Sequence, residues 1–70
     1  MDKQEIAKLQ AYFRAKFNLP SIRIEGRPKK MNSAEVYIGD EFVGVIFRDD
    51  EDGEVSWNFQ MAILEMDLEG

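Results

Sequence analysis

Apolar residues near the start of the chain recur at intervals of three and four positions, the spacing of one face of an α-helix. These residues are Ile6, Leu9, Phe13 and Phe17. Asp2 stands where an N-cap is needed, and Glu5 follows at the capping-box spacing. The pattern predicts a helix over Lys3–Phe17, followed by the helix-ending residues Asn18 and Pro20.

Beyond this helix, apolar and polar residues alternate in four segments, as in half-buried β-strands. The segments are Ser21–Glu25, Ser33–Ile38, Phe42–Arg48 and Val55–Leu64. A polar loop over Gly26–Asn32, a two-residue hairpin turn at Gly39 and Asp40, and a turn over Asp49–Gly53 separate them. This order predicts one small α+β domain over residues 1–70. Its N-terminal helix packs on one face of an antiparallel three- to four-stranded sheet, mostly a meander.

The two-residue turn determines which residues of the central hairpin face each other. It pairs Ile38 with Glu41 and Val36 with Val43. One face of the sheet then carries five apolar side chains: Ala34, Val36, Val43, Val45 and Phe47. We expect the helix to cover this face.

The length of the turn before the fourth strand decides whether that strand adds apolar residues to the same face. An odd-length turn adds Trp57, Phe59 and Met61. An even-length turn would place Asn58 and Gln60 among the valines instead. We therefore expect an odd-length turn, with Trp57 buried against Phe13 or Leu9.

One helix cannot cover both faces of the sheet, so the opposite face is expected to be partly exposed. It carries a candidate interaction surface, made of Tyr37, Phe42, Ile46, Asn58 and Gln60. Tyr37 and Phe42 face each other across the hairpin, which stabilises the strand pair. Two interpretations stay open: the pair shields the backbone, or the surface docks a protein partner or a second copy of the chain.

The C-terminal segment is ambiguous. After Leu64 the apolar positions change parity to Leu64, Met66 and Leu68, which an extended segment with a bulge explains. Met61, Leu64 and Leu68 also fit a helical stripe, in which case Gln60–Glu69 is a second helix. The alternation of apolar and acidic residues favours the extended form.

Composition limits how such a small domain can be stabilised. The chain has 70 residues and contains no cysteine and no histidine, which excludes disulfides and zinc sites built from these residues. The hydrophobic core of a domain this small contributes roughly 3–5 kcal/mol to the free energy of unfolding, so self-association is the remaining means of stabilisation. The same composition removes the usual catalytic bases and nucleophiles, so we expect no enzyme activity, cofactor or metal. No apolar run is long enough to span a membrane.

Charge is divided unevenly along the chain. Residues 1–30 carry a net charge of +5 and residues 31–70 a net charge of −10. The candidate anion contact consists of Arg23, Arg27, Lys29 and Lys30. It is the basis of the alternative function, binding of an anion or a nucleic acid, although the acidic overall charge of −5 argues against nucleic acid. The acidic turn Asp49–Glu54 lacks the EF-hand spacing and is expected to be a solvated hairpin turn.

Four stretches of the chain resemble a family of small uncharacterised bacterial proteins that is catalogued as a domain of unknown function. The stretches are Arg27–Lys30, Ser33–Phe42, Arg48–Gly53 and Asn58–Leu64. The resemblance covers nearly the whole chain and implies a stand-alone bacterial cytoplasmic protein. It transfers no activity, cofactor or site residue. The leading functional hypothesis is therefore an interaction protein, acting as a homodimer or docking on another protein.

Overall fold

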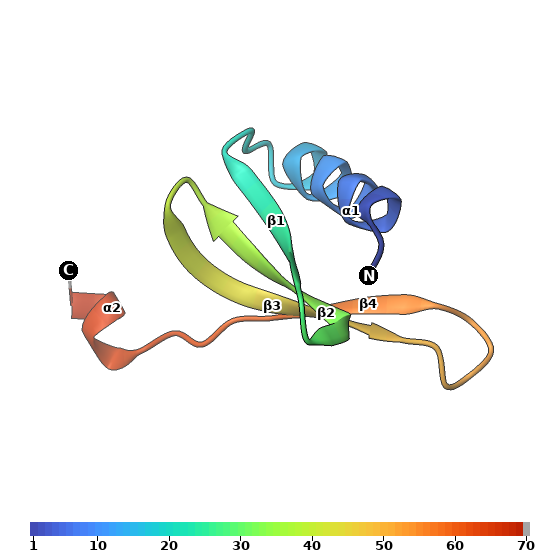
Figure 1. The fold of residues 1–70 in the computed structure, drawn as a ribbon. Coiled ribbons are helices and arrows are strands. Elements are labelled where there is room, and N and C mark those ends of the chain that lie inside the picture. The colour runs from blue at the N-terminus through green and yellow to red at the C-terminus, as the bar shows by residue number, and fades with distance from the viewer. Residues whose placement is uncertain (70) are drawn as a thin grey trace.

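The computed structural model describes residues 1–69, which form one helix, a four-stranded antiparallel sheet and a short second helix (Figure 1). The elements are α1 (Lys3–Lys16), β1 (Ile22–Arg27), β2 (Lys30–Ile38), β3 (Glu41–Asp49), β4 (Ser56–Gln60) and α2 (Glu65–Glu69). The strands are neighbours in chain order, β1-β2-β3-β4. The predicted α+β fold, with an N-terminal helix and an antiparallel meander, is confirmed.

The caps predicted for α1 are present at both ends. Asp2 has an extended backbone, and its side chain accepts a hydrogen bond from the backbone N–H of Glu5 at 2.8 Å. Asn18 adopts a positive φ of 51°, a conformation that ends helices. The helix therefore stops at Lys16, with Phe17 as its C-cap.

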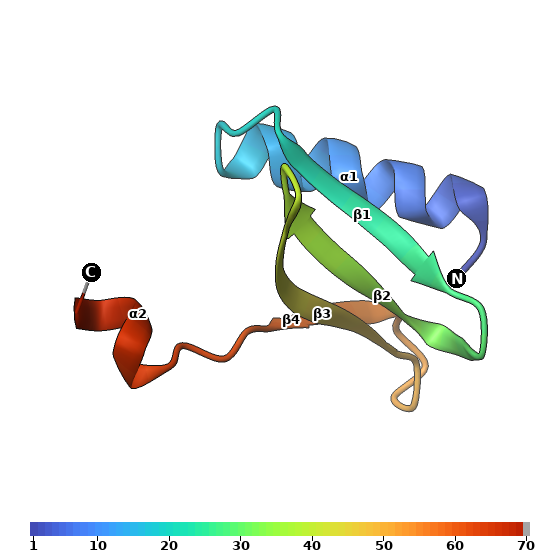
Figure 2. The same cartoon turned by 60° about the vertical axis from the view of Figure 1, so that its left-hand side comes forward.

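Side-chain hydrogen bonds join α1 to the edge strand β1. Arg14 Nε donates to the carbonyl of Ile22 at 2.7 Å, and the backbone N–H of Ile24 donates to Gln10 Oε1 at 2.9 Å. Figure 2 shows α1 lying along β1. The buried apolar core lies below it and comprises Leu9, Phe13, Ile22, Ile24, Ala34, Val36 and Ile46.

A bulge in β3 changes the register predicted for the central hairpin. Ile38 faces Glu41, as predicted, but Val36 pairs with Gly44 and not with Val43. Val43 is the extra residue, and it reverses the facing of every β3 residue that follows. Ile46, predicted on the open face, is 0% exposed, whereas Phe47 lies on that open face.

The turn between β3 and β4 is even in length, so the predicted odd length is wrong. Asp49 faces Ser56, which leaves residues 50–55 in the turn. The bulge and the even-length turn each reverse the predicted facing of the residues that follow, so the two reversals cancel in β4. Phe59 faces Ile46 across the strands, so Phe59 and Trp57 still lie on the side of the sheet that carries α1.

The last strand is shorter than predicted. β4 ends at Gln60, residues 61–64 continue without regular structure, and residues 65–69 form α2. The preference for extended structure throughout residues 60–69 was therefore wrong for α2. The carboxylate of Asp67 accepts a hydrogen bond from the backbone N–H of Leu64 at 2.9 Å, which caps this turn of helix.

Neither described helix is both long and apolar enough to cross a membrane.

Candidate interaction surface

The molecule exposes more surface than a compact protein of its size. Its accessible area is 5668 Å², whereas a folded monomer of 8.1 kDa exposes about 4,500 Å². Its radius of gyration is 12.9 Å, against about 11 Å for a compact domain of this length. About 1,200 Å² of surface is therefore left that a compact fold would bury.

Part of this surplus lies in residues 61–69, here called the C-terminal arm. The arm leaves the sheet at the end opposite the β3–β4 turn (Figures 1 and 2). Its residues Met61, Leu64 and Asp67 border a hollow of about 510 Å³ together with the first half of β3, including Phe42. The large apolar side chains of the arm are exposed, up to 77% for Leu68: Met61, Ile63, Leu64, Met66 and Leu68. Apolar residues placed singly on a surface are ordinary, but five within nine residues form a concentration that needs an explanation.

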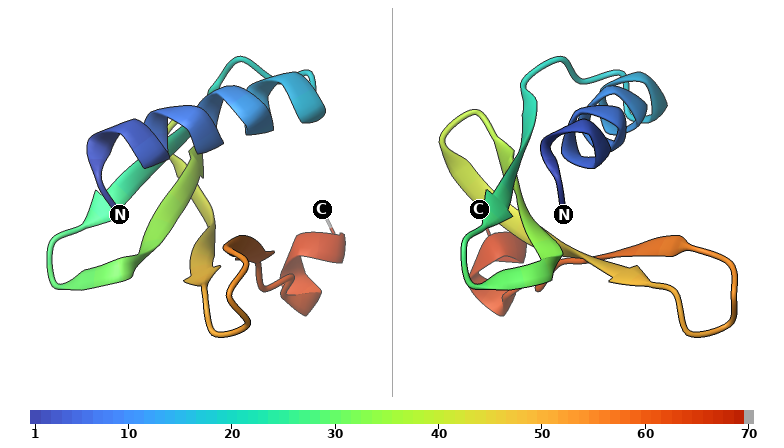
Figure 3. Two further views of the ribbon diagram at one scale, coloured as in Figure 1. Left: turned by 90° about the vertical axis from the view of Figure 1, so that its right-hand side faces the viewer. Right: turned by 45° about the vertical axis from the view of Figure 1, so that its right-hand side comes forward.

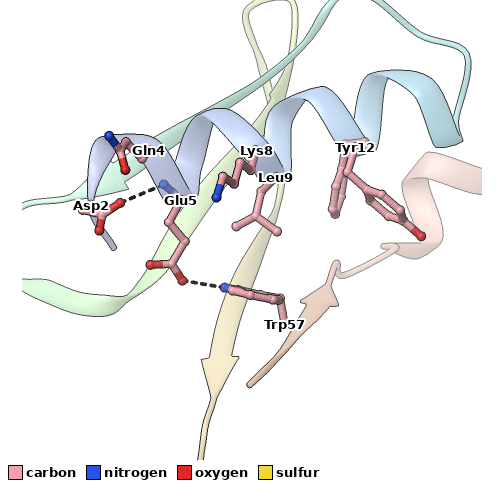
Figure 4. A pocket seen from close by; sticks show the side chains of 8 residues that line it. Asp2, Gln4, Glu5, Lys8, Leu9, Tyr12 and Trp57 are labelled. Atoms are coloured by element: carbon pink, nitrogen blue, oxygen red, sulfur yellow. Dashed lines mark hydrogen bonds between the residues drawn. The ribbon is translucent and has the colours of Figure 1, made fainter. Parts of the chain in front are cut away.

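A second part lies between α1 and β4, in a groove of about 570 Å³ here called the α1–β4 groove (Figure 4). It forms because α1 follows β1 while β4 diverges from the helix (Figure 3). Trp57 lines it from β4, and all its other lining residues belong to α1 or its N-cap: Asp2, Gln4, Glu5, Lys8, Leu9, Tyr12 and Phe13.

Trp57 is not buried as predicted. It is 40% exposed, because α1 approaches β4 at only a few contacts. One of these is an edge-to-face contact between the rings of Phe13 and Phe59, with centroids 5.5 Å apart. The side of the β4 aromatics that faces the groove is left open.

Glu5 forms the polar link across the groove. Its Oε2 accepts a hydrogen bond from Trp57 Nε1 at 2.7 Å and lies 3.6 Å from Arg48 Nε (Figure 4). Arg48 Nε is inaccessible to solvent and has no hydrogen-bond partner of its own, so the Glu5 carboxylate is its nearest compensating charge. The link joins the first turn of α1 to β3 and β4.

Replacing Glu5 by alanine is expected to lower the free energy of unfolding by about 1–2 kcal/mol, because a hydrogen bond to a charged group is lost. Glu5→Gln keeps an acceptor for Trp57 and should cost less. Urea denaturation measures both variants. Glu54→Ala is the control, since Glu54 is exposed in the β3–β4 turn and forms no salt bridge within residues 1–69. A Glu5→Ala variant as stable as the wild type would show that the link does not hold α1.

The predicted interaction surface on the other face is present in part. The rings of Tyr37 and Phe42 meet edge to face with centroids 5.7 Å apart. Asn58 and Gln60 are exposed on the same face. Ile46 does not belong to it, because the bulge turns this residue into the core.

Sequence reasoning missed two members of this open face, Val45 and Phe47, which face Gln60 and Asn58 in β4. Phe47 is 43% exposed. The signal that could have identified them is Gly44, since a glycine inside a strand often marks a bulge.

Tyr37 is held by polar neighbours on both sides. Its hydroxyl donates a hydrogen bond to Glu35 Oε1 at 2.9 Å, and the guanidinium of Arg23 lies 4.6 Å from the centre of its ring. The hydrogen bond to Glu35, reinforced by desolvation and by the negative charge of Glu35, raises the pKa of Tyr37, while Arg23 acts in the opposite direction.

A Tyr12→Phe variant leaves Tyr37 as the single tyrosine of the sequence. Its phenol is therefore expected to ionise above pH 10, the ordinary pKa of tyrosine. Because the folded-state pKa is raised, its contribution to stability is present below about pH 10 and is lost as pH rises through the folded pKa. Ultraviolet absorbance of the phenolate measures the titration. Adding Glu35→Gln should lower the midpoint, and an unchanged midpoint would contradict the assignment to Glu35.

The structure brings three of the four predicted anion contacts together at the β1–β2 turn, where Arg27, Lys29 and Lys30 line one hollow, while Arg23 lies outside that lining. Arg23 pairs with Glu25, and Arg27 donates to Ser33 Oγ at 3.3 Å and lies 3.9 Å from a carboxylate oxygen of Glu35. Lys29 and Lys30 lie at the β1–β2 turn, and neither forms a salt bridge within residues 1–69. The hollow has a volume of about 300 Å³. Two of the four cations are thus already matched by carboxylates of the domain.

The carboxylates of the acidic turn do not converge. Within residues 1–69, no three acidic side chains are placed to hold a metal ion. Asp49 instead accepts a hydrogen bond from the backbone N–H of Glu51 at 3.1 Å, which stabilises the turn locally.

Residues 5–67 match a protein-family model described as "Protein of unknown function (DUF3126)". The chain belongs to this family. The resemblance found in the sequence is thereby confirmed, and the match runs from Glu5, in the groove, to Asp67, in α2. No curated protein and no solved structure matches the chain. Membership of DUF3126 brings no ligand or reaction with it, so a function has to be argued from the surfaces described above.

Proposed function

We propose that this DUF3126 domain is a non-enzymatic interaction module that buries its C-terminal arm and α1–β4 groove against another protein chain. The observation that supports it is the surplus of about 1,200 Å² of accessible surface. A standard protein–protein interface buries about 800 Å² on each partner. The surplus is therefore large enough to supply one side of such an interface.

The chemistry of the chain supports a role without catalysis. The sequence contains no histidine and no cysteine, so proton transfer and covalent catalysis would depend on carboxylates and hydroxyls. Two of the serines, Ser21 and Ser56, are exposed, and the third, Ser33, binds Arg27. The absence of cysteine and the family resemblance also support the proposal that the module works in the bacterial cytoplasm.

The test compares the full-length chain with a double variant of the arm, Leu64→Asp with Leu68→Asp. Both side chains are exposed, so the fold should survive and the circular dichroism spectrum should be unchanged. We expect the wild type to associate with itself or with a partner from its own cells, and the double variant to lose that association. Sedimentation equilibrium and affinity capture with both baits measure this. Identical association by the two chains would contradict the proposal.

The alternative proposal is an anion or nucleic-acid binder that uses the loop Arg23–Lys30. The exposed side chains of Lys29 and Lys30 support it. A phosphate-binding loop should lose affinity for an oligonucleotide steeply as the salt concentration rises. A Lys29→Ala/Lys30→Ala variant should reduce the slope of the logarithm of the binding constant against the logarithm of the salt concentration by about two. An interaction module without a phosphate site should show no binding in the same titration.

A further inference from the structure

The side of the sheet that carries α1 is only partly covered. α1 packs on β1 and reaches β4 mainly through Phe13 and Glu5, so the apolar groove beside Trp57 has no covering element within residues 1–69. A helix-on-sheet layer is stable when apolar faces cover each other completely. A short apolar segment laid beside α1 would complete the layer.

The C-terminal arm has the composition of such a segment, but it does not reach the groove of its own chain. Trp57 stands near the start of β4, and the arm leaves from the other end of that strand. Residues 61–64 continue in the direction of β4, away from α1 (Figures 1 and 2). Groove and arm are therefore both left open in the single chain.

We propose that the α1–β4 groove of each copy receives the C-terminal arm of a second copy, giving a two-fold dimer with exchanged arms. This inference rests on the proposed function and names the partner. In a two-fold exchange each copy contributes one groove and one arm, so both open surfaces are covered at once. A partner that filled the groove alone would leave the five apolar side chains of the arm in water.

The area available agrees with a dimer of ordinary size. The surplus of about 1,200 Å² per copy exceeds the share of about 800 Å² that each partner contributes to a standard interface. An interface of standard size would thus take up most of the surplus.

Charge favours the same arrangement. With its N-cap Asp2, α1 carries a net charge of +2, from Lys3, Lys8, Arg14 and Lys16 against Asp2 and Glu5. Of these groups Asp2, Glu5 and Lys8 line the groove, and the other cations lie on α1 outside its lining. The arm carries a net charge of −3, from Glu65, Asp67 and Glu69. An arm lying beside the α1 of a second copy brings opposite charges together, which assists association and sets the orientation of the arm. This local attraction opposes the repulsion between two chains that each carry −5.

Sedimentation equilibrium from low to hundreds of micromolar tests the exchange. The wild type is expected to reach twice the chain mass of 8.1 kDa. Leu64→Asp with Leu68→Asp should raise the dimer dissociation constant at least tenfold. Met31→Glu, at an exposed apolar residue outside both the groove and the arm, should leave it within about twofold. A wild type that stays monomeric throughout, or a dimer lost in Met31→Glu and retained in the arm variant, would overturn the exchange.

The only tryptophan supplies a second readout, because Trp57 lines the groove. Its emission should shift to shorter wavelength as the wild type is concentrated, and this shift should be absent in the arm variant. A concentration-dependent dimer whose Trp57 emission stays constant would place the contact elsewhere and overturn the exchange.

Engineered disulfides test which surfaces meet, and the chain has no cysteine of its own to interfere. Tyr12→Cys chains on the groove should cross-link to Leu68→Cys chains when the two are mixed and oxidised. Met31→Cys chains, whose cysteine is exposed outside the groove, should link to Leu68→Cys chains at least several-fold less. Equal yields for the two mixtures would overturn the exchange.

The exchange can fail while the proposed function stands. A wild type that is monomeric at every concentration, yet captures a different protein that the arm variant does not, would exclude the second copy as partner and keep the interaction module. Loss of both behaviours would end both proposals.

Discussion

Replacing Ile46 by alanine is expected to leave the domain largely unfolded at room temperature. Ile46 is 0% exposed and belongs to the single core, and truncation of a buried isoleucine to alanine costs about 2–5 kcal/mol. A domain of this size has roughly 3–5 kcal/mol to lose. The milder Ile46→Val should cost about 1 kcal/mol, which urea denaturation followed by circular dichroism can measure.

Phe47→Ala is the matched control, because Phe47 is the next residue of β3 and lies on the opposite face. It removes a larger side chain than Ile46→Ala, yet it should cost less than about 1 kcal/mol, since Phe47 is half exposed. The order of the two effects reports the register of β3 directly. If Phe47→Ala unfolded the domain and Ile46→Ala did not, the bulge at Val43 would be misplaced.

Gly44→Ala is expected to have the second-largest effect. A Cβ at this position would lie 2.5 Å from the backbone oxygen of Gln60 and 2.6 Å from a ring carbon of Phe59, both in β4. Because the first of these atoms is backbone, the strands themselves must separate, and such overpacking costs about 1–3 kcal/mol. β4 should loosen from β3, and the thermal midpoint should fall.

Gly26→Ala is the control for this substitution. Its Cβ would come 3.0 Å from Ile6 Cδ1, the far end of a flexible side chain, which can move aside. We expect a smaller loss of stability than for Gly44→Ala. Amide hydrogen exchange adds the location: protection in β4 should decrease in the Gly44 variant and not in the Gly26 variant. Unchanged protection in β4 would show that the β3–β4 pair tolerates the added methyl group.

The predictions that held are those that depend on neighbouring residues. The N-cap at Asp2, the helix end at Asn18 and the tight turn at Gly39 each arise from local hydrogen bonding or backbone freedom, so the sequence identifies them. The same applies to the order of the strands, because short turns leave little choice except a meander.

The facing of the β3 residues was mispredicted for a physical reason. Val45 and Phe47 are as apolar as Ile46, so the side-chain pattern alone does not say which parity is buried. The single extra residue at Val43 decides it, and that bulge depends on how β2 and β4 pack against β3. The candidate interaction surface was therefore right for Tyr37 and Phe42 and wrong for Ile46.

The arm and the groove also differ from what the sequence pattern predicts, because both depend on how the elements pack. From the sequence, residues 60–69 were an extended segment or a helix, and Trp57 was a core residue. The tertiary structure separates the arm from the sheet, ends β4 at Gln60 and leaves Trp57 partly open. These outcomes depend on the angle between α1 and the twisted sheet, a property of the assembled layers and not of any short segment.

Local propensity and composition were thus enough to predict the first helix, the four strands and their order, and to show which side-chain chemistry the chain lacks. Which face of β3 is buried, where β4 ends and whether the groove beside α1 is covered all depend on packing between distant elements. The reason is that burial is a collective quantity: each strand exposes or hides a side chain according to what the other elements cover.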